Sequence, residues 1–399
     1  MVKIIGGTYR EIDIDTITHN IFGSGLRAVN FFLENSGQEI SYYTVGNKLI
    51  ESHLENFKNV YPKFNYKVSN SNQVLTFKYD FATDEPRIYP NPRILKDKPT
   101  IEVSNGNIIC FGMLDAEFCI NAQKVVYDPQ TGINPAKFSD YGKTEELIYI
   151  VNHGEAKSIS NQIELEGILS FFFDEEKVKA VIIKDGPHGA RLYESKSNFY
   201  HIPAYKTKNV YKIGSGDVFT SSFAFFWFNQ KYTIRESALR ASKSTAIFCN
   251  SMTYKLPDLN FSNFDFEIQP LKDLNIKQVY LAAPIFSLSD VILIDKIRES
   301  LLGFGIKVFS PYHDIGYGDD KEITEKDLEG IDNSDIIFSV LDGLDSGTLI
   351  ELGYAMSKGK KIIGYHRTIN SDSLLMLKTA DIEFFDNLTT ALYQVIWNV

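Results

Sequence analysis

The regular alternation of short apolar runs with helix-like stretches stops once in this chain, between Leu256 and Pro270. Proline and asparagine residues in this segment are typical of a linker, while Phe261, Phe264 and Phe266 favour its docking onto a folded surface. At 399 residues the chain is too long for one ordinary hydrophobic core. We therefore predict a first domain at residues 1–257, a linker at residues 258–274, and a second domain at residues 275–399.

Both predicted domains are of the α/β class, because strand-like and helix-like stretches alternate in each. In the first domain the strands include Val2–Ile5, Ile108–Phe111, Leu147–Val151 and Ala180–Ile183, and the helices include Gly25–Glu34, Asn161–Phe173, Asp217–Phe228 and Ile234–Asn250. In the second the strands are Gln278–Ala282, Lys307–Ser310, Ile336–Leu341 and Lys361–Tyr365, with helices at Ser289–Phe304, Thr324–Asn333 and Thr348–Lys358. This order predicts a doubly wound parallel sheet in the second domain, with ligands beyond the carboxyl ends of its strands.

Charge and composition narrow the class of ligand. The net charge is −10 and no cluster of lysine and arginine stands out, so we expect a small molecule rather than a nucleic acid. No apolar run approaches the roughly 20 residues of a membrane span, and three unpaired-looking cysteines favour a reducing cytoplasm. The seven histidines show no spacing typical of a metal site.

Acidic residues follow the third strand of the second domain. Asp342 and Asp345 lie in the loop that leaves this strand, and Glu351 lies in the first turns of the next helix. The positive field of the helix start favours the ionised form of a carboxyl group there. An ionised Glu351 that faces the anomeric carbon of a sugar is a nucleophile, and a second carboxyl group would protonate the departing nitrogen base.

The same spacing also predicts a purely structural role. Thr348–Glu351 matches the capping box, in which Glu351 would bond back to the backbone at the start of the helix. Asp345 beside Gly347 is equally typical of a turn. Spacing alone leaves both interpretations open.

Four ordered motifs in the second domain resemble those of nucleoside 2-deoxyribosyltransferases: Val279–Phe286, Phe309–Asp314, Lys326–Asp335 and Leu341–Ala355. The resemblance implies Glu351 as the nucleophile. It implies that Asp345 holds the sugar or orients Glu351, and that Asp327 hydrogen-bonds and helps protonate the base. Substrate contacts are implied for Tyr280, Pro284, Asp342, Ser346 and Gly347. A homo-oligomer is implied as well, and glycosyl chemistry of this kind needs no cofactor.

The second domain also departs from the pattern of this family. Residues 366–399 do not clearly match the family's C-terminal part, and His313 and Asp314 replace other polar groups. Related N-glycosidases hydrolyse nucleoside monophosphates, for which Ser346 or His313 would contact the phosphate. Transfer or hydrolysis, and ribose or deoxyribose, therefore stay open.

A glycine-rich turn precedes a strongly apolar helix in the first domain. Gly214, Ser215 and Gly216 would let backbone N–H groups approach an anion at the helix start. Asp217 could then take a proton from a hydroxyl group that attacks a phosphoryl group. The alternative is a plain turn with Asp217 as a helix cap.

This segment, Lys212–Phe219, resembles the Gly-Ala-Gly-Asp motif of ribokinase-like (PfkB) sugar and nucleoside kinases, and three upstream segments agree with it: Gly23–Asn30, Asn152–Ala156 and Ile182–Ala190. The resemblance implies a ribokinase-like α/β/α fold with Asp217 as the base. It implies that Asn152, Glu155 and Lys184 lie near the phosphates, with ATP and magnesium as cofactors.

Here too the sequence departs from the family. The stretch between Asp13 and Gly23 is too short for the usual strands of a sugar-covering lid, and Tyr211, Lys212 and Ile213 replace the usual acidic and threonine residues. An active kinase and a pseudokinase that senses a nucleotide both remain open.

Our leading hypothesis is an enzyme that cleaves or transfers at the N-glycosidic bond of a nucleoside or nucleotide, fused to a kinase-like domain. The alternative is a regulated glycohydrolase of a nucleotide such as NAD, with a non-catalytic sensor domain. A third hypothesis, two binding modules without catalysis, is disfavoured by the three carboxylates Asp327, Asp345 and Glu351.

Overall fold

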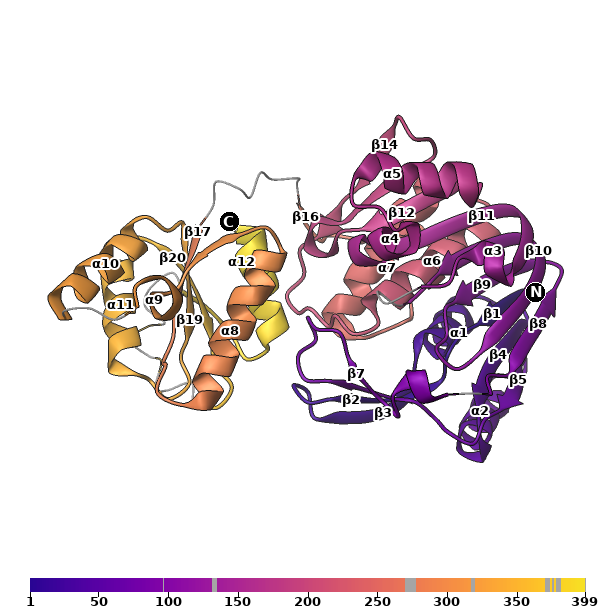
Figure 1. Cartoon of the computed structure of the whole chain (residues 1–399), viewed down its shortest axis with the longest axis horizontal. Helices are drawn as coiled ribbons and strands as arrows, with labels where there is room; N and C mark the ends of the chain where they lie inside the picture. The colour runs from indigo at the N-terminus through magenta and orange to yellow at the C-terminus, as the bar shows by residue number, and fades with distance from the viewer. Residues whose placement is uncertain are drawn as a thin grey trace. The chain divides into compact units, whose positions relative to one another are not determined.

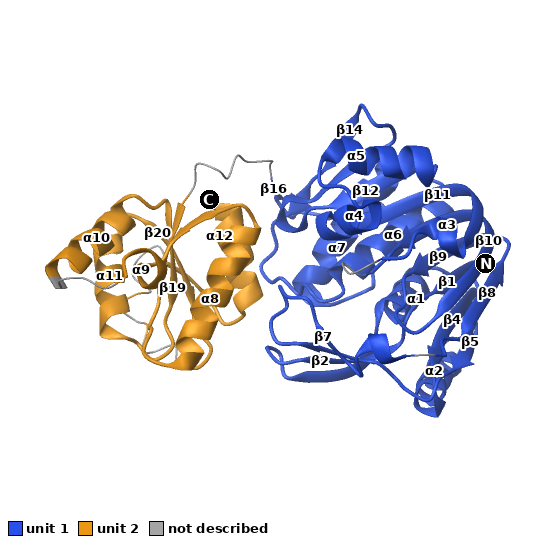
Figure 2. Cartoon of the chain, in the orientation of Figure 1, with its two compact units in different colours: residues 1–270 blue, residues 271–399 orange. Residues whose placement is uncertain are grey.

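The computed structural model describes residues 1–95, 97–130, 135–269, 278–316, 320–369, 374, 377 and 382–398. The chain forms two compact units, residues 1–270 and 271–399 (Figure 2). Among the helices of these described residues, none is long and apolar enough to cross a membrane.

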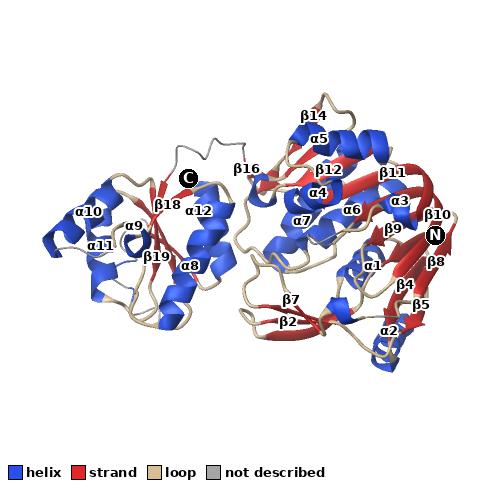
Figure 3. Ribbon diagram, in the orientation of Figure 1, coloured by secondary structure: helices blue, strands red, loops and turns tan. Residues whose placement is uncertain are grey.

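The first unit is built on a ten-stranded sheet (Figure 3). Its strands are β1 (Val2–Ile5), β4 (Ile40–Gly46), β5 (Phe64–Asn70), β8 (Thr100–Ser104), β9 (Asn107–Phe111), β10 (Glu117–Asp128), β11 (Gly142–Asn152), β12 (Ala180–Lys184), β13 (Ala190–Tyr193) and β14 (Phe199–Ile202). The order is β14-β13-β12-β11-β10-β9-β1-β4-β5, with β8 paired to β10. All neighbours are parallel except at the edge, where β13 pairs antiparallel with β12 and β14.

Helices cover both faces of this sheet. They are α1 (Ser24–Asn35), α2 (Lys48–Val60), α3 (Phe138–Tyr141), α4 (His153–Ser160), α5 (Leu165–Ser170), α6 (Ser215–Phe228) and α7 (Ile234–Ser251). Successive strand residues point to opposite faces, so Ile148 and Ile150 join the core with α1, α6 and α7. Tyr149 and Val151 join the opposite core with α3, α4 and α5. The unit is therefore the expected α/β/α sandwich.

The helix predicted at Asn161–Phe173 is wrong in its extent. Asn161 takes the left-handed conformation (φ 53°) and ends α4. A new helix, α5, begins at Leu165, and a π-helical segment at Phe171–Glu175 follows it. Asparagine tolerates positive φ better than most residues, which makes this position a helix end.

A second, four-stranded sheet accompanies the large one in the first unit. Its order is β3 (Thr18–Phe22), β2 (Tyr9–Asp13), β6 (Thr76–Tyr79), β7 (Arg87–Tyr89). The stretch between Asp13 and Gly23 is too short to form this sheet by itself, and more distant residues supply the other strands. Asp13–Gly23 supplies only one hairpin arm, and two strands from residues 76–89 complete the sheet.

The segment predicted as a linker contacts the first unit in its described part. Phe261 is buried in the core beside Phe226, and Phe264 packs on Tyr205. The short strand β16 (Ile268–Gln269) pairs with β15 (Ala204–Tyr205). Residues 270–274 of the predicted linker lie outside the described residues.

The second unit is a doubly wound domain, as predicted, with a five-stranded, all-parallel sheet (Figure 1). Its strands are β17 (Gln278–Ala282), β18 (Lys307–Phe309), β19 (Ile336–Val340), β20 (Lys361–Tyr365) and β21 (Ile382–Phe385), in the order β18-β17-β19-β20-β21. The helices are α8 (Leu288–Gly303), α9 (Pro311–Asp314), α10 (Asp320–Asp332), α11 (Ser346–Ser357) and α12 (Leu388–Asn398).

The direction of winding reverses between β17 and β19. After β17 the chain moves outward to β18, and after β19 it moves to β20 on the other side. Helices α8 and α12 pack together, as do α10 and α11. The loops that leave β17 and β19 therefore diverge and open a crevice at the carboxyl ends of the strands, the usual ligand site of such folds.

Candidate functional sites

A cavity of about 820 Å³ lies at this switch point of the second unit. Leu281 and Ala283 line it from the end of β17, and Ser310 to His313 line it from the end of β18. Asp327 of α10, together with Asp345, Gly347, Thr348 and Glu351 at the start of α11, completes its polar part. The three carboxylates predicted from the sequence thus meet in one cavity.

Asp345 is the N-cap of α11. Its Oδ2 accepts hydrogen bonds from the Thr348 backbone N–H at 2.8 Å and from Thr348 Oγ1 at 3.1 Å. Gly347 makes this possible, because a Cβ there would lie 3.1 Å from Asp345 Oδ2. The capping-box interpretation of Thr348–Glu351 is therefore wrong: the helix starts at Ser346, so Thr348 is inside it and Glu351 is free to face the cavity.

Glu351 shares a buried hydrogen-bonded group with Asp327 and Tyr280. The Tyr280 hydroxyl donates to Asp327 Oδ1 at 2.8 Å. Burial, followed by the charge of Asp327, raises the pKa of Glu351 to about 8, and burial also raises the pKa of Asp327. Two such carboxyl groups cannot both ionise readily at neutral pH, so the pair holds one proton between them.

This proton state corrects one expectation. The start of α11 was expected to keep Glu351 ionised, but Glu351 is the sixth residue of the helix. The field of a helix terminus falls off within its first turn. Burial and Asp327 therefore outweigh it.

The other predicted substrate contacts divide into two groups. Gly347 lines the cavity, and Tyr280 reaches it through Asp327. Pro284 and Ser346 do not appear among its described lining residues, although their neighbours Ile285 and Gly347 do.

Asp342 has a different position from the one implied. Its carboxylate accepts hydrogen bonds from the backbone N–H groups of Arg367 and Thr368 and from the Thr368 hydroxyl. It therefore joins the loop after β19 to the loop after β20.

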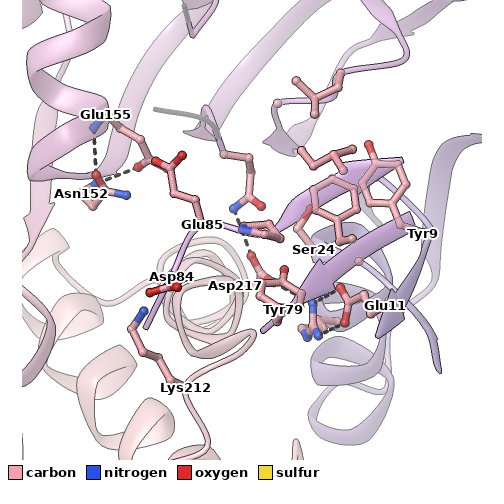
Figure 4. Close-up of a pocket in the computed structure, with 18 of the residues that line it drawn as sticks. Tyr9, Glu11, Ser24, Tyr79, Asp84, Glu85, Asn152, Glu155, Lys212 and Asp217 are labelled. Atoms are coloured by element: carbon pink, nitrogen blue, oxygen red, sulfur yellow. Dashed lines mark hydrogen bonds and ion pairs between the residues drawn. The ribbon is translucent and has the colours of Figure 1, made fainter. Parts of the chain in front are cut away.

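A second cavity, of about 450 Å³, lies within the first unit between the four-stranded sheet and the ends of the large sheet. Tyr9, Glu11 and Tyr79 line it from the small sheet, as Figure 4 shows. Asn152 and Glu155 line it from the start of α4, and Asp217 from the start of α6. Strands of the small sheet thus cover the predicted kinase-like site.

Asp217 lines this cavity with both of its oxygens engaged. Oδ2 accepts from Arg27 Nη1 at 3.2 Å, and Oδ1 accepts from Gln130 Nε2 at 3.0 Å. Burial raises the pKa of Asp217 to about 6, although Arg27 opposes the shift. The N-cap of α6 is Gly214, at φ 85°, so the interpretation of Asp217 as that cap is wrong.

Arg27 connects Asp217 to the small sheet. Its guanidinium forms a two-pronged ion pair with Glu11 of β2, with one N–O distance of 2.8 Å. The group is buried, and it lies 5.3 Å from the ring centre of Phe22. One arginine therefore connects α1, the lid sheet and α6.

The predicted phosphate site contains a buried lysine. Lys184 Nζ donates to Asp128 Oδ2 at 2.9 Å, and the Thr220 hydroxyl donates to the same oxygen at 2.8 Å. A Cβ on Gly216 would lie 3.4 Å from this Nζ, so Lys184 lies beside the first turn of α6. Gly214, Ser215, Gly216 and Lys184 are together, as the resemblance implied.

Asn152 and Glu155 form a capping box at the start of α4. The Glu155 carboxylate accepts from the Asn152 N–H at 2.7 Å, and Asn152 Oδ1 accepts from the Glu155 N–H at 2.8 Å. Burial, together with the charge of Asp128, raises the pKa of Glu155 to about 7. Among the described residues, no cluster of three or more His, Cys, Asp or Glu side chains is placed to hold a metal ion.

Four residues of the polar network at the cavity of the first unit were not predicted from the sequence: Glu11, Arg27, Asp128 and Gln130. Asp128 had a signal, since it ends the apolar run of β10 where functional groups of parallel sheets gather. Arg27 lies inside Gly23–Asn30, one of the segments that resemble the kinase family, but no role was predicted for it. Nothing local marks Gln130.

Comparison with known protein families identifies both domains. Residues 279–388 match the model of the nucleoside 2-deoxyribosyltransferase family, and residues 122–256 match that of the pfkB family of carbohydrate kinases. The chain carries one domain of each family. The nucleoside 2-deoxyribosyltransferase domain includes the Glu351 cavity, and the pfkB domain includes Asp217. Both families are enzyme families, and the pfkB family typically uses a phosphoryl donor.

Solved structures similar to the chain come from the ribokinase family. Ribokinase from Thermotoga maritima is 16% identical over 64% of this chain and 94% of its own, with a TM-score of 0.46. Adenosine kinase from Schistosoma mansoni is 11% identical over 65% and 98%, with a TM-score of 0.48. The nucleoside kinase from Methanocaldococcus jannaschii is 14% identical over 62% and 92%, with a TM-score of 0.43. No curated protein matches the chain in sequence.

Proposed function

We propose that the nucleoside 2-deoxyribosyltransferase domain breaks the N-glycosidic bond of a nucleoside or nucleotide through a glycosyl-enzyme on Glu351. The observation that carries this proposal is the group formed by Glu351, Asp327 and Tyr280 at the wall of the switch-point cavity. It provides a nucleophile and an acid in one hydrogen-bonded unit, the pair that glycosyl transfer requires.

The reaction would begin when the shared proton moves from Glu351 to Asp327, which leaves Glu351 ionised. A Glu351 oxygen attacks C1′ of the sugar while the C1′–N bond breaks. The bonding electrons go to the base nitrogen, which takes the proton from Asp327. Water or the nitrogen of a second base then attacks C1′, gives its proton to Asp327 and releases Glu351 as a carboxylate.

Two neighbours would hold this chemistry in place. The Tyr280 hydroxyl fixes Asp327, and the cap made by Asp345 fixes the start of the helix that carries Glu351. Asp345 also lines the cavity, and we expect it to contact the sugar. By analogy with the family, we expect a homo-oligomer whose neighbouring subunit helps to close the site.

The test is incubation of the full chain with a panel of ribo- and deoxyribonucleosides, with and without a second base. We expect base release, or base exchange if the enzyme is a transferase. Glu351→Gln should lower the rate at least 10³-fold, because it removes the nucleophile. Glu329→Gln, an exposed glutamate of α10 outside the cavity lining, is the matched control and should keep the full rate.

A mass spectrum of the intact protein during turnover provides a direct measurement. A slow substrate should add the mass of its sugar to the peptide that contains Glu351. Full activity of Glu351→Gln, or the sugar on another residue, would contradict the proposal.

A second proposal concerns the pfkB domain, for which the contacts of Asp217 favour a regulatory role. Asp217 has one oxygen on Arg27 and the other on Gln130, so an acceptor hydroxyl group would have to displace one of them. We propose a ligand-sensing domain that controls cleavage of the N-glycosidic bond by the other domain. Phosphoryl transfer from ATP to sugars or nucleosides should then be undetectable, and Asp217→Asn should alter only the regulation.

Detectable transfer that Asp217→Asn abolishes would instead identify an active kinase. In that case the turn Gly214–Gly216 and Lys184 would hold the phosphates of the donor, which supplies the phosphoryl group. Asp217 would accept the proton of the attacking hydroxyl group.

A further inference from the structure

The charges around the Glu351 cavity are of one sign. Asp327, Asp345 and Glu351 line it, and none of its lining residues in the described part of the chain is lysine or arginine. The remaining basic side chain there is His313, and both of its ring nitrogens have partners. Nδ1 contacts Ser310 Oγ at 3.0 Å, and Nε2 contacts Asp295 Oδ1 at 2.9 Å. A phosphate in this cavity would face carboxylates, with no lysine or arginine among the described lining residues to balance them.

A positively charged ligand would be stabilised in this cavity. Ionised carboxylates that approach each other in a partly buried site gain most from a cation placed between them. The cavity also has aromatic side chains whose rings are open to solvent: Phe286 is 79% exposed and Tyr312 is 44% exposed. Aromatic faces attract cations, above all flat organic ones.

We propose that this cavity selects nucleosides whose base carries a positive charge, such as N-glycosylated pyridinium or N7-alkylated purine rings, and that it disfavours a 5′-phosphate. The inference rests on the proposed function and specifies its substrate class. The flat cationic ring lies against Phe286 and Tyr312, with its charge toward Asp327 and Asp345. The sugar C1′ faces Glu351.

A cationic base also simplifies the reaction. When a Glu351 oxygen attacks C1′, the electrons of the C1′–N bond return to the ring nitrogen and cancel its positive charge. The base leaves neutral, so no proton has to reach it. Water then attacks C1′ and Glu351 is released as a carboxylate. The proton of the water leaves to the solvent, because the neutral base does not need it and Asp327 keeps the shared proton.

The experiment compares three pyridine nucleosides that have the same ring and bond. Nicotinamide riboside is a cation, nicotinic acid riboside has an added carboxylate that makes it net neutral, and nicotinamide mononucleotide adds a 5′-phosphate. Each is used with the full-length protein in its ribo and 2-deoxyribo forms. We expect kcat/KM for the cation to exceed that of either other compound at least tenfold.

Variants test whether the carboxylates cause this preference. Asp345→Asn keeps a cap on α11, because asparagine also caps helices, but removes one charge. It should reduce the ratio between the cation and the net-neutral compound at least threefold, whatever it does to the absolute rates. Asp332→Asn is the matched control, on the same helix as Asp327 but paired with Lys358 outside the cavity, and should leave the ratio unchanged.

The outcomes separate this inference from the proposed function. Cleavage of nucleosides with equal kcat/KM for the cation and the neutral compound, or with a preference for the phosphate, would overturn the inference alone. If no nucleoside is cleaved, titration calorimetry of the same compounds with Glu351→Gln decides. Tighter binding of the cation would support the inference even though the proposed function had failed, and equal binding would overturn both.

Discussion

Two buried carboxyl groups, Glu351 and Asp217, illustrate how partners determine the state of a residue. Asp217 has Arg27 beside it, which opposes the effect of burial and leaves its pKa at about 6. Glu351 has another carboxyl group beside it, which adds to the effect of burial and raises its pKa to about 8. One site is therefore arranged to hold a charge, and the other to hold a proton.

The proton on Glu351 gives a pH-dependent stability. The pKa of this group rises from 4.5 to about 8 on folding, so the folded protein keeps a proton that the unfolded chain releases. Stability must then fall as the pH rises from 4.5 to 8. Glu351→Gln cannot ionise, so its free energy of unfolding should exceed that of the wild type by about 1–3 kcal/mol at pH 8 and by little at pH 5. Urea unfolding at both pH values measures this, and parallel curves for the two proteins would contradict it.

Arg27 should be far more important for stability than an exposed arginine. Arg27→Met leaves Glu11 and Asp217 buried without their cation, and breaking such a group costs about 3–5 kcal/mol. Arg87→Met, whose side chain is 55% exposed beside Asp80, is the control and should leave the unfolding curve almost unchanged. Denaturant unfolding of both variants measures the two losses in the free energy of unfolding. Equal losses would show that the buried Arg27 ion pairs stabilise the protein no more than an exposed pair does.

At the scale of elements, both cavities lie at helix starts: α11 follows the parallel strand β19, and α6 follows the loop after β15. Helix α11 begins with Asp345 as its cap, and α6 begins with Gly214 in the left-handed conformation. Each start fixes one functional carboxyl group, Glu351 or Asp217. Substitutions at the cap positions Asp345 and Gly214 should therefore change the stability of the helix start and the activity of the site by amounts that can be measured separately.

The cap of α11 can be separated from the charge of Asp345. Asp345→Ala removes the acceptor for Thr348 and should cost about 1 kcal/mol of stability, whereas Asp345→Asn should cost only a few tenths. Both variants lose the charge, so both should lose glycosyl activity to a similar degree if the charge matters to the reaction. Thermal unfolding and initial rates together test this, and a fully active Asp345→Asn would assign the residue to the cap alone.

Gly214 is required by its conformation and by its neighbour. A Cβ at this position would lie 2.2 Å from Arg27 Nε, and its φ of 85° is unfavourable for other residues. Gly214→Ala should therefore displace Arg27 and destabilise the first unit by about 2–4 kcal/mol. Gly106→Ala also has a positive φ, of 79°, but meets no atom within 4 Å, so it should cost only about 1 kcal/mol. Equal losses would mean that the backbone strain acts alone.

The motifs found in the sequence are local, and this determines which parts of the sites they predict. Glu351 and Asp345 are six residues apart on one helix start, and a short pattern captures both. The Arg27–Asp217 bond spans 190 positions and the Thr220–Asp128 bond spans 92, so no local pattern can reveal either. The same limit explains the lid, whose sheet joins residues 9–22 to residues 76–89.

At the scale of the whole molecule, the chain has two units with separate cores. The large aliphatic and aromatic clusters of the first unit contain no residue of the second, and Tyr280, Ile337 and Leu352 belong to a cluster confined to the second unit. Units with separate cores unfold as separate cooperative transitions unless a large interface couples them. Each variant described above changes the stability of one unit and therefore identifies the transition of that unit.

Calorimetry of the full chain should therefore show two transitions that respond to different substitutions. Arg27→Met should lower only the transition of the first unit, by roughly 5–10 °C for a loss of about 3 kcal/mol in a unit of this size. Glu351→Gln should raise only the other transition at pH 8, and a cationic nucleoside should raise that same transition further by mass action. If Arg27→Met shifts both transitions equally, the units unfold as one body. In that case a ligand in the pfkB domain would also raise the stability of the unit that contains the Glu351 cavity.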